Sequence, residues 1–538
     1  MSKSDNDKKY SFKKLNLTFS KKAEAVIFFI VTLLNLYPVL SNQYFPTLDG
    51  AAHLYNANII KELILHPEGA FANYFEFNSS PVPNWTGHFI LTFFRFIFPA
   101  FLAEKCLLII YLVGLPYAFR SLVKRLNPKN ALGAYFIFPF CYTSIFLLGF
   151  YNFSIGILLM FVLFSAWIKW ESKKFSWKKF LLFSLLFTLL YFSHLVVFAI
   201  TVAFLISRSF YLAGYDYCFK KELKKPFRQA FFNESGFLLL TALLPLILLI
   251  KYFLNRNFFT SSTWLSNEKL IESLTAMESL IGFSYDLEKG FAFYIFCSIV
   301  LLVLFILFKR VLLFAQQRIL IQQNDYWLFA ALGVLILYFL LPNESGNAGF
   351  VSIRLNLIFY LLLICWIASQ QLSKLLLGPL MLLVLFCNFK LNDYYHTVAK
   401  DLNQYTNAIT DCSKYIEYNS TVIPLNYDEN WLTFHFSNYL GVERNIIVLD
   451  NYESTLDYFP IRWSKESFPH IIIGENPVEI RGCTSWLSNL NGNIEQTNYV
   501  FIMGKPQQND CYVSIKNELN TSYQFIYSND LVELYKRK

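Results

Sequence analysis

Long apolar runs recur along this chain from Ala23 to about Phe389, which is far more than a water-soluble fold needs for its core. Of the 538 residues, 55% are hydrophobic and 15% are charged, whereas an average soluble domain has about 25% charged residues. The runs predict an α-helical polytopic membrane protein with about 11–13 transmembrane helices. The candidate spans are 24–40, 103–119, 132–150, 153–169, 179–193, 194–210, 236–254, 290–308, 326–341, 355–369 and 375–389.

Lysine and arginine are concentrated in alternate connections between these runs. Basic clusters precede the first run and recur near 120–125, 173–179, 220–225 and 309–310. Because cytoplasmic loops carry the excess of positive charge, residues 1–22 are predicted to be a cytoplasmic N-terminus and the C-terminal region to be periplasmic. The net charge of +9 then reflects topology in a bacterial inner membrane and not binding to nucleic acid.

A further apolar run, 86–101, is short and contains Arg95. Counting it as a span would break the charge alternation downstream, so we expect it to be re-entrant or to lie in the membrane interface. Alternatively, it crosses the membrane and 179–210 forms one long crossing. In both cases residues 23–390 form the predicted transmembrane domain.

The composition changes beyond about Leu391, where spans stop and polar residues become frequent. The segment 392–417 is predicted to be an amphipathic helix, and five strand-like runs follow. Residues 391–538 are therefore predicted to form an extracytoplasmic mixed α/β domain, whose aromatic stretch 452–463 rests against the membrane domain or covers a cavity. The strand-like runs are 421–425, 445–449, 470–473, 499–503 and 523–527.

The strongest polar signal follows the first span. A helix is predicted near 49–66, with Asp49 at its start. His53 and Asn56 lie four and seven residues further on, so all three share one helix face just outside the membrane. This arrangement suits a general base beside a polar substrate. The alternative is structural, with Asp49 acting only as an N-cap.

Four other polar clusters lie on the same predicted external face, and polar groups at membrane depth usually line a cavity. Each has a plainer explanation as well, such as a hydrogen bond between helices for His194, a bond to broken backbone for Asn152, or a lipid headgroup contact for Arg354. Together they predict one shared external cavity. The candidate substrate-binding residues are His53, Asn56, His88, Asn152, His194, Glu344 and Arg354.

No cofactor is predicted from the sequence. Asp49, His53, His88 and His194 could converge on a divalent ion, but their spacing matches no known zinc motif, so no metal ligand is assigned. The chain also has no P-loop or dinucleotide-binding fingerprint.

The order of a basic N-terminus, one span and an external acidic residue that opens a helix resembles the GT-C superfamily of membrane glycosyltransferases. The strings LDGAAHLYNA (48–57) and GFYNF (149–153), with Arg354, are also similar to a group of membrane proteins from Bacteroidota. Two features depart from the GT-C pattern, since Gly50 replaces a second acidic residue and the GFYNF loop has none.

The resemblance implies a sugar transfer from a polyprenyl-phosphate donor at the outer face of the membrane. Asp49 would be the general base, Arg354 would stabilise the leaving phosphate, and His53, Asn152 and His194 would position the substrates. The partners implied are the lipid-linked sugar, the bilayer and a glycan, lipid or protein acceptor, without nucleic acid. A transporter or lipid flippase, and a non-enzymatic assembly protein, remain the alternatives.

Overall fold

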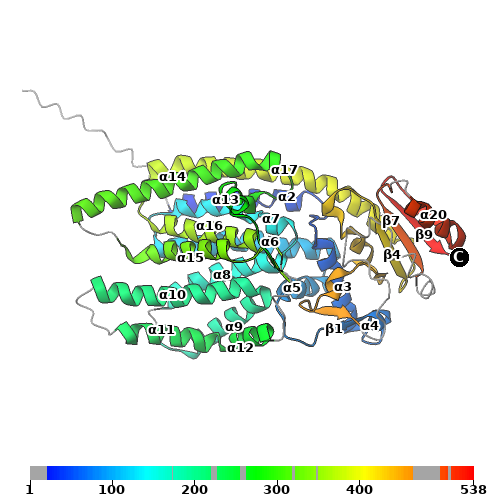
Figure 1. Ribbon diagram of the computed structural model, residues 1–538, viewed down its shortest axis with the longest axis horizontal. Coiled ribbons are helices and arrows are strands. Elements are labelled where there is room, and N and C mark those ends of the chain that lie inside the picture. Colours follow the sequence, from blue (N-terminus) through cyan, green and yellow to red (C-terminus); the bar gives the residue numbers. More distant parts are fainter. Residues whose placement is uncertain are drawn as a thin grey trace, which may run out of the picture.

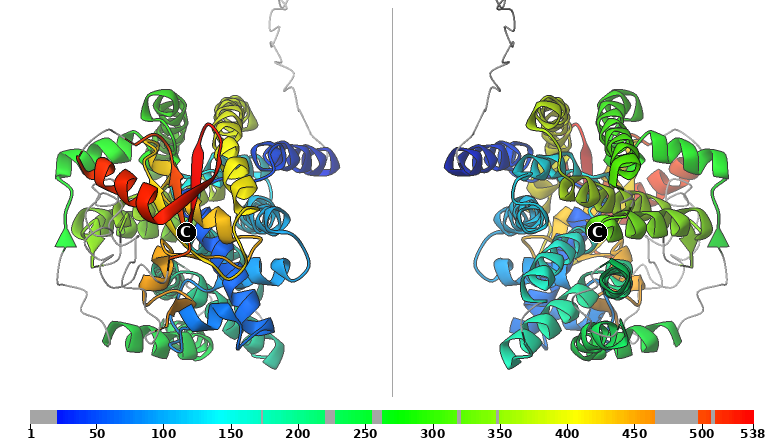
Figure 2. Two further views of the ribbon diagram at one scale, coloured as in Figure 1. Left: turned by 90° about the vertical axis from the view of Figure 1, so that its right-hand side faces the viewer. Right: turned by 90° about the vertical axis from the view of Figure 1, so that its left-hand side faces the viewer.

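The computed structural model describes residues 21–171, 174–219, 227–254, 262–317, 321–346, 349–464, 497–506 and 510–538, and the statements below refer to these. The chain forms a bundle of long helices with a sheet-containing domain at one end of the long axis (Figure 1). End-on, the helices pack side by side beneath that domain (Figure 2). A single cluster of buried hydrophobic residues extends through both parts, from Phe28 to Leu534.

Seven helices are long and apolar enough to cross a membrane, and a pair bent by 68° makes an eighth if it is one span. α8 and α16 are mostly apolar and largely buried, as expected for central helices. The spans are α6 (Ala100–Leu126), α8 (Tyr151–Trp170), α10 (Leu195–Phe219), α14 (Tyr285–Gln317), α15 (Tyr326–Leu340) together with the short helix η3 (Gln323–Asp325) before it, α16 (Val351–Ser369) and α17 (Lys374–Ser413). The bent pair is α11 (Phe227–Thr241) with α12 (Leu243–Leu254).

The remaining predicted spans are helices that are shorter or irregular. The predicted span 24–40 is divided between α1 (Lys21–Leu34) and α2 (Tyr37–Leu40), and 132–150 contains the 3-10 helix η1 (Ala131–Cys141) and α7 (Ser144–Leu147). The region 179–210 is broken at His194, between α9 (Trp177–Ser193) and α10.

The run 86–101 forms the short helix α5 (Thr86–Arg95), followed directly by α6. Before it lie α3 (Gly50–Leu65), α4 (Ala70–Tyr74) and β1 (Phe75–Phe77). The chain between α12 and α14 holds β2 (Ser262–Thr263), α13 (Asn267–Thr275) and η2 (Glu278–Leu280), while η3 (Gln323–Asp325) precedes α15 and β3 (Glu344–Ser345) follows it. β2 and β3 pair with each other.

The C-terminal domain contains a five-stranded mixed sheet in the order β5-β4-β7-β9-β8. β4 is parallel to both of its neighbours, and β9 is antiparallel to β7 and β8. The sequence analysis did not predict β9, and the predicted strand 470–473 lies outside the described residues. The strands are β4 (Thr421–Asn426), β5 (Ile447–Val448), β7 (Tyr499–Met503), β8 (Tyr523–Ser528) and β9 (Val532–Arg537), with α20 (Asp510–Ser522) between β7 and β8.

Two connections hold this domain on the membrane helices. α17 runs unbroken from the last predicted span through most of the predicted helix 392–417. Gly378 and Pro379 lie near its start, and neither residue type occurs again before the helix ends at Ser413. In addition, β6 (Ile461–Trp463) pairs with β1, and Phe75 stacks on Trp463 with ring centroids 4.4 Å apart. η5 (Phe436–Gly441) packs against α3, and Glu453 of η6 (Tyr452–Thr455) reaches His53 of the same helix. η4 (Trp431–Thr433) lies just before η5.

Candidate active site

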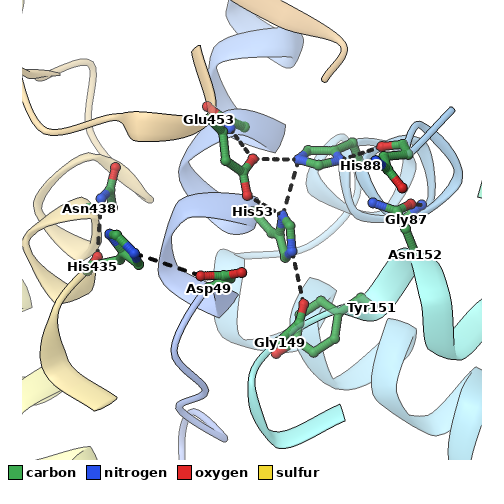
Figure 3. Close-up of polar contacts among 12 residues, drawn as sticks. Asp49, His53, Gly87, His88, Gly149, Tyr151, Asn152, His435, Asn438 and Glu453 are labelled. Carbon is green, nitrogen blue, oxygen red and sulfur yellow. Dashed lines mark hydrogen bonds and ion pairs between the residues drawn. The ribbon is translucent and has the colours of Figure 1, made fainter. Parts of the chain in front are cut away.

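Asp49 stands at the start of α3, but its side chain does not cap the helix. Its backbone N–H donates to Leu148 at 3.2 Å, and its side chain is buried. Nε2 of His435 lies 3.8 Å from Oδ1 (Figure 3). Burial raises the pKa of Asp49 to about 7, although the neighbouring His53 acts in the opposite direction. A carboxyl with a pKa near neutrality is suited to accept a proton.

Gly149 lets the GFYNF loop approach Asp49 closely. Its φ is +86°, and a Cβ at this position would lie 2.9 Å from the backbone nitrogen of Asp49 and from Oγ1 of Thr47. The carbonyl oxygen of Gly149 in turn accepts a hydrogen bond from Nε2 of His53 at 2.9 Å. This loop therefore fixes the start of α3 and the orientation of His53.

His53 belongs to a buried cluster with His88 of α5 and Glu453 of η6 (Figure 3). Nδ1 of His53 lies 2.7 Å from Oε1 of Glu453, and Nε2 of His88 lies 2.9 Å from Oε2. Burial opposes ionisation of Glu453, but the two imidazoles outweigh it and lower the pKa of the carboxyl. Burial likewise disfavours the charged form of both rings, yet Glu453 raises the pKa of His53, while that of His88 is lowered.

A cavity of about 680 Å³ opens beside Asp49. The GFYNF loop, the break between α9 and α10, the start of α16 and the C-terminal domain all contribute to its wall. The stretch 452–463 does cover it, as predicted, through Tyr452, Asp457, Tyr458 and Phe459. Its other polar lining residues include Asp49, His53, Asn84, Asn152, His194, Arg354 and His435.

Arg354 is a partly buried cation on the cavity wall. Its guanidinium lies over the rings of Phe150 and Phe153, 5.0 and 5.8 Å from their centroids. Its Nε–H has no acceptor, and no carboxylate lies within ion-pair distance, among the residues that the structure describes. A cation held on aromatic faces and left without a carboxylate is ready to bind an anion.

Two further candidates from the sequence line the same cavity. Nδ1 of His194 is buried without a hydrogen-bond partner among the described residues, and its ring packs edge-on against Phe153. Oδ1 of Asn152 accepts the backbone N–H of Gly87 at 2.7 Å, so part of this amide holds the first turn of α5.

The other three candidates lie away from the cavity lining. Asn56 donates to Glu453 through Nδ2 and accepts from Asn451 at 2.7 Å, so both ends of its amide contact the C-terminal domain. His88 is buried behind His53. Glu344 is exposed on β3 and accepts a hydrogen bond from Thr263 at 3.0 Å.

Sequence reasoning expected the stretch 452–463 near the cavity but singled out no site residue in the C-terminal domain. His435, Tyr452 and Glu453 all reach the site from that domain, and Tyr452 stacks on His435 with ring centroids 4.2 Å apart. The one available signal was Glu453, an acidic residue at the start of the aromatic stretch 452–463, which was expected to meet the membrane domain or cover a cavity.

No protein-family model matches the chain, and neither does any curated protein. Solved structures do match, and two of ArnT align with nearly the whole length of this chain. The crystal structure of ArnT from Cupriavidus metallidurans in the apo state is 9% identical, with a TM-score of 0.53 over 96% of this chain and 98% of that one. The ArnT structure bound to undecaprenyl phosphate is 8% identical, with a TM-score of 0.51 and the same coverage.

ArnT is a GT-C glycosyltransferase. The chain has a GT-C fold. At this level of identity the likeness concerns the fold, and it confirms the fold implied by the order of basic N-terminus, first span and external acidic residue. Within this GT-C fold, Asp49, His194 and Arg354 meet at one cavity although they follow different spans.

Proposed function

We propose that the chain is a glycosyltransferase that moves a sugar from a polyprenyl-phosphate donor to an acceptor at the outer face of the inner membrane. The observation that carries the proposal is that a buried carboxylate, Asp49, lines one cavity with Arg354, a cation that has no carboxylate partner within the described part of the chain. The GT-C fold, shared with an ArnT structure that is bound to undecaprenyl phosphate, supports the choice of donor.

Asp49 is the proposed general base. The acceptor hydroxyl or amine attacks the anomeric carbon of the sugar and forms the new glycosidic bond. Its proton passes to the carboxylate of Asp49, which is not occupied with capping α3. The bond between the anomeric carbon and the phosphate oxygen breaks, and the polyprenyl phosphate leaves with the bonding electrons.

Arg354 is the proposed partner of that phosphate. Charge develops on the phosphate oxygen as the bond breaks, and a guanidinium fixed nearby lowers the barrier by stabilising this charge. His53, Asn152 and His194 are proposed to position the sugar or the acceptor from the cavity wall. Asn56 and His88 would act indirectly, through the contacts that hold Glu453.

The charge distribution supports an external cavity. α6 begins with Ala100 close to α5 and carries Arg120, Lys124 and Arg125 toward its other end. Since basic residues mark the cytoplasmic side, the end of the bundle with the cavity and the C-terminal domain is the proposed periplasmic end.

Sugar transfer by the purified protein tests this proposal. A panel of undecaprenyl-phosphate-linked hexoses and pentoses, labelled in the sugar, is incubated with the protein and a membrane extract as the source of acceptor. We expect Asp49→Asn to lower turnover by about 10²–10⁴-fold, the usual contribution of a general base. Asp401→Asn, an exposed change on α17, is the matched control.

Thermal unfolding of the same samples separates chemistry from folding. Asp49→Asn preserves the size of the side chain and removes no helix cap, so its unfolding temperature is expected to stay close to that of the parent. If the Asp49→Asn protein transfers sugar as fast as the parent, Asp49 is not the general base.

A further inference from the structure

The cluster of His53, His88 and Glu453 joins three segments that are distant in the sequence. The residues come from α3, α5 and η6, and all three side chains are buried, with Glu453 fully inaccessible. One ligand atom from each lies within 4.8 Å of the other two (Figure 3). From the sequence, no metal ligand was assigned to His53 or His88, because their spacing matches no known zinc motif, and Glu453 was not among the candidates.

Backbone carbonyls determine which nitrogen of each ring carries hydrogen. Nε2 of His53 lies 2.9 Å from the carbonyl oxygen of Gly149, and Nδ1 of His88 lies 3.2 Å from that of Asn84. A carbonyl oxygen only accepts hydrogen bonds, so these two nitrogens are the donors. In neutral rings, Nδ1 of His53 and Nε2 of His88 are then the atoms with free lone pairs.

These lone pairs converge on a carboxylate. The two nitrogens are 3.2 Å apart, and each lies within 2.9 Å of an oxygen of Glu453. Oε1 of Glu453 is buried and faces Nδ1 of His53 at 2.7 Å, so with both rings neutral it meets a lone pair there and has no donor among the described residues. Three acceptors that face one another in a buried site repel unless positive charge lies between them.

The donor set fits a divalent transition metal. Two imidazole nitrogens and one carboxylate form a combination that Zn²⁺ uses widely, whereas Mg²⁺ and Ca²⁺ prefer oxygen ligands alone. Histidines that bind metal usually donate their second ring N–H to a carbonyl or carboxylate. Both histidines here do so, toward Gly149 and Asn84.

We propose that His53, His88 and Glu453 bind one divalent transition-metal ion, with Zn²⁺ as the best match. The ion links the C-terminal domain to α3 and α5 beside the cavity, and its three protein ligands leave one position of a tetrahedral site for another ligand. Asp49 remains outside the ligand set. This inference does not rest on the proposed sugar transfer.

Metal content is the direct test. The full-length protein, purified without a histidine tag, is stripped with EDTA, reloaded with Zn²⁺, passed through a desalting column and analysed by elemental mass spectrometry. We expect about one ion per chain in the parent and a loss of at least tenfold in occupancy for Glu453→Gln and His88→Gln. His66→Gln, a change at an exposed histidine, is the control and is expected to retain the ion.

A second measurement avoids variants altogether. Loading the stripped parent with Co²⁺ should produce the visible absorption of a tetrahedral nitrogen and oxygen site, and adding Zn²⁺ should remove it. The proposal is overturned if the reloaded parent holds no stoichiometric Zn²⁺ and shows no such spectrum, or if a folded Glu453→Gln variant binds as much as the parent. Neither readout involves sugar transfer, so failure here leaves the proposed function standing.

Discussion

The phenol oxygen of Tyr55 accepts the backbone N–H of Val448 at 3.0 Å and donates to the carbonyl oxygen of Ile446 at 2.7 Å. Tyr55 lies in the middle of α3, and Val448 belongs to the edge strand β5. Gly441 packs directly on the same ring, where a Cβ would lie 2.2 Å from a ring carbon. One buried side chain thus fixes the C-terminal domain on the helix that begins at Asp49.

Tyr55→Phe is expected to weaken this attachment. The change leaves the N–H of Val448 and the carbonyl of Ile446 buried without their partner, which costs about 1–3 kcal/mol. Thermal unfolding in detergent should show a lower midpoint for Tyr55→Phe than for the parent. The midpoint of Tyr217→Phe should equal that of the parent, because this tyrosine is exposed. Equal midpoints for the parent and both variants would contradict the role of this contact.

Arg354→Gln is expected to reduce the affinity for undecaprenyl phosphate by about tenfold or more, since charge-assisted hydrogen bonds to phosphate are worth about 1.5–3 kcal/mol. Arg354→Lys keeps the positive charge but loses the planar guanidinium with its paired N–H donors. Its affinity for undecaprenyl phosphate should therefore lie between that of the parent and that of Arg354→Gln. Binding is measured by isothermal titration in detergent. Arg228→Gln, an exposed change on α11, is the control, and a Kd for Arg354→Gln equal to the parent value would exclude a phosphate contact.

The titration of Asp450 is expected to make the free energy of unfolding depend on pH. Burial raises the pKa of this carboxyl from its ordinary 3.8 to about 7, although Ser437 and Asn438 donate to it. Between these values the folded state binds more protons than the unfolded state, so stability falls as the pH rises and levels off above about 7. One pKa unit corresponds to about 1.4 kcal/mol.

Asp450→Asn removes this titration. Raising the pH from 5 to 8 should lower the unfolding temperature of the parent more than that of Asp450→Asn, while Asp401→Asn should follow the parent. Parallel pH profiles for the parent and Asp450→Asn would contradict the assignment.

Reporter fusions test the predicted orientation. A fusion after Lys220 is expected to report the cytoplasm and one after Lys538 the periplasm, because lysines cluster around the first position and the second follows the C-terminal domain. Activity of the same reporter at both positions would contradict the topology.

The residues that face the cavity from the membrane domain were accessible from sequence because alternate connections of a helical bundle lie at the same end. Asp49, His194 and Arg354 each follow a predicted crossing on the external side, and that is enough to group them. Glu453 and His435 could not be found in this way, because their positions depend on how the C-terminal domain packs on α3. No local period or motif encodes that packing.

The strands show a similar division. The apolar run that forms β7 is buried at every position and was evident in the sequence. In β9, Glu533, Lys536 and Arg537 make up half of the six residues, which masks its strand character. The break at His194 was ambiguous in sequence, since apolar residues flank it on both sides and only a short polar interruption marks the turn.

α17 also acts as a spacer. Its 40 residues extend over about 60 Å at 1.5 Å per residue, roughly twice the ~30 Å hydrocarbon thickness of a bilayer. About half of this helix therefore stands clear of the lipid and sets the height at which the sheet is held. A single residue gained or lost in that outer half would turn the sheet by about 100° and shift it along the axis, which would carry His435 and Glu453 away from Asp49 and His53. The number of residues in one helix thus determines whether the two halves of the pocket meet.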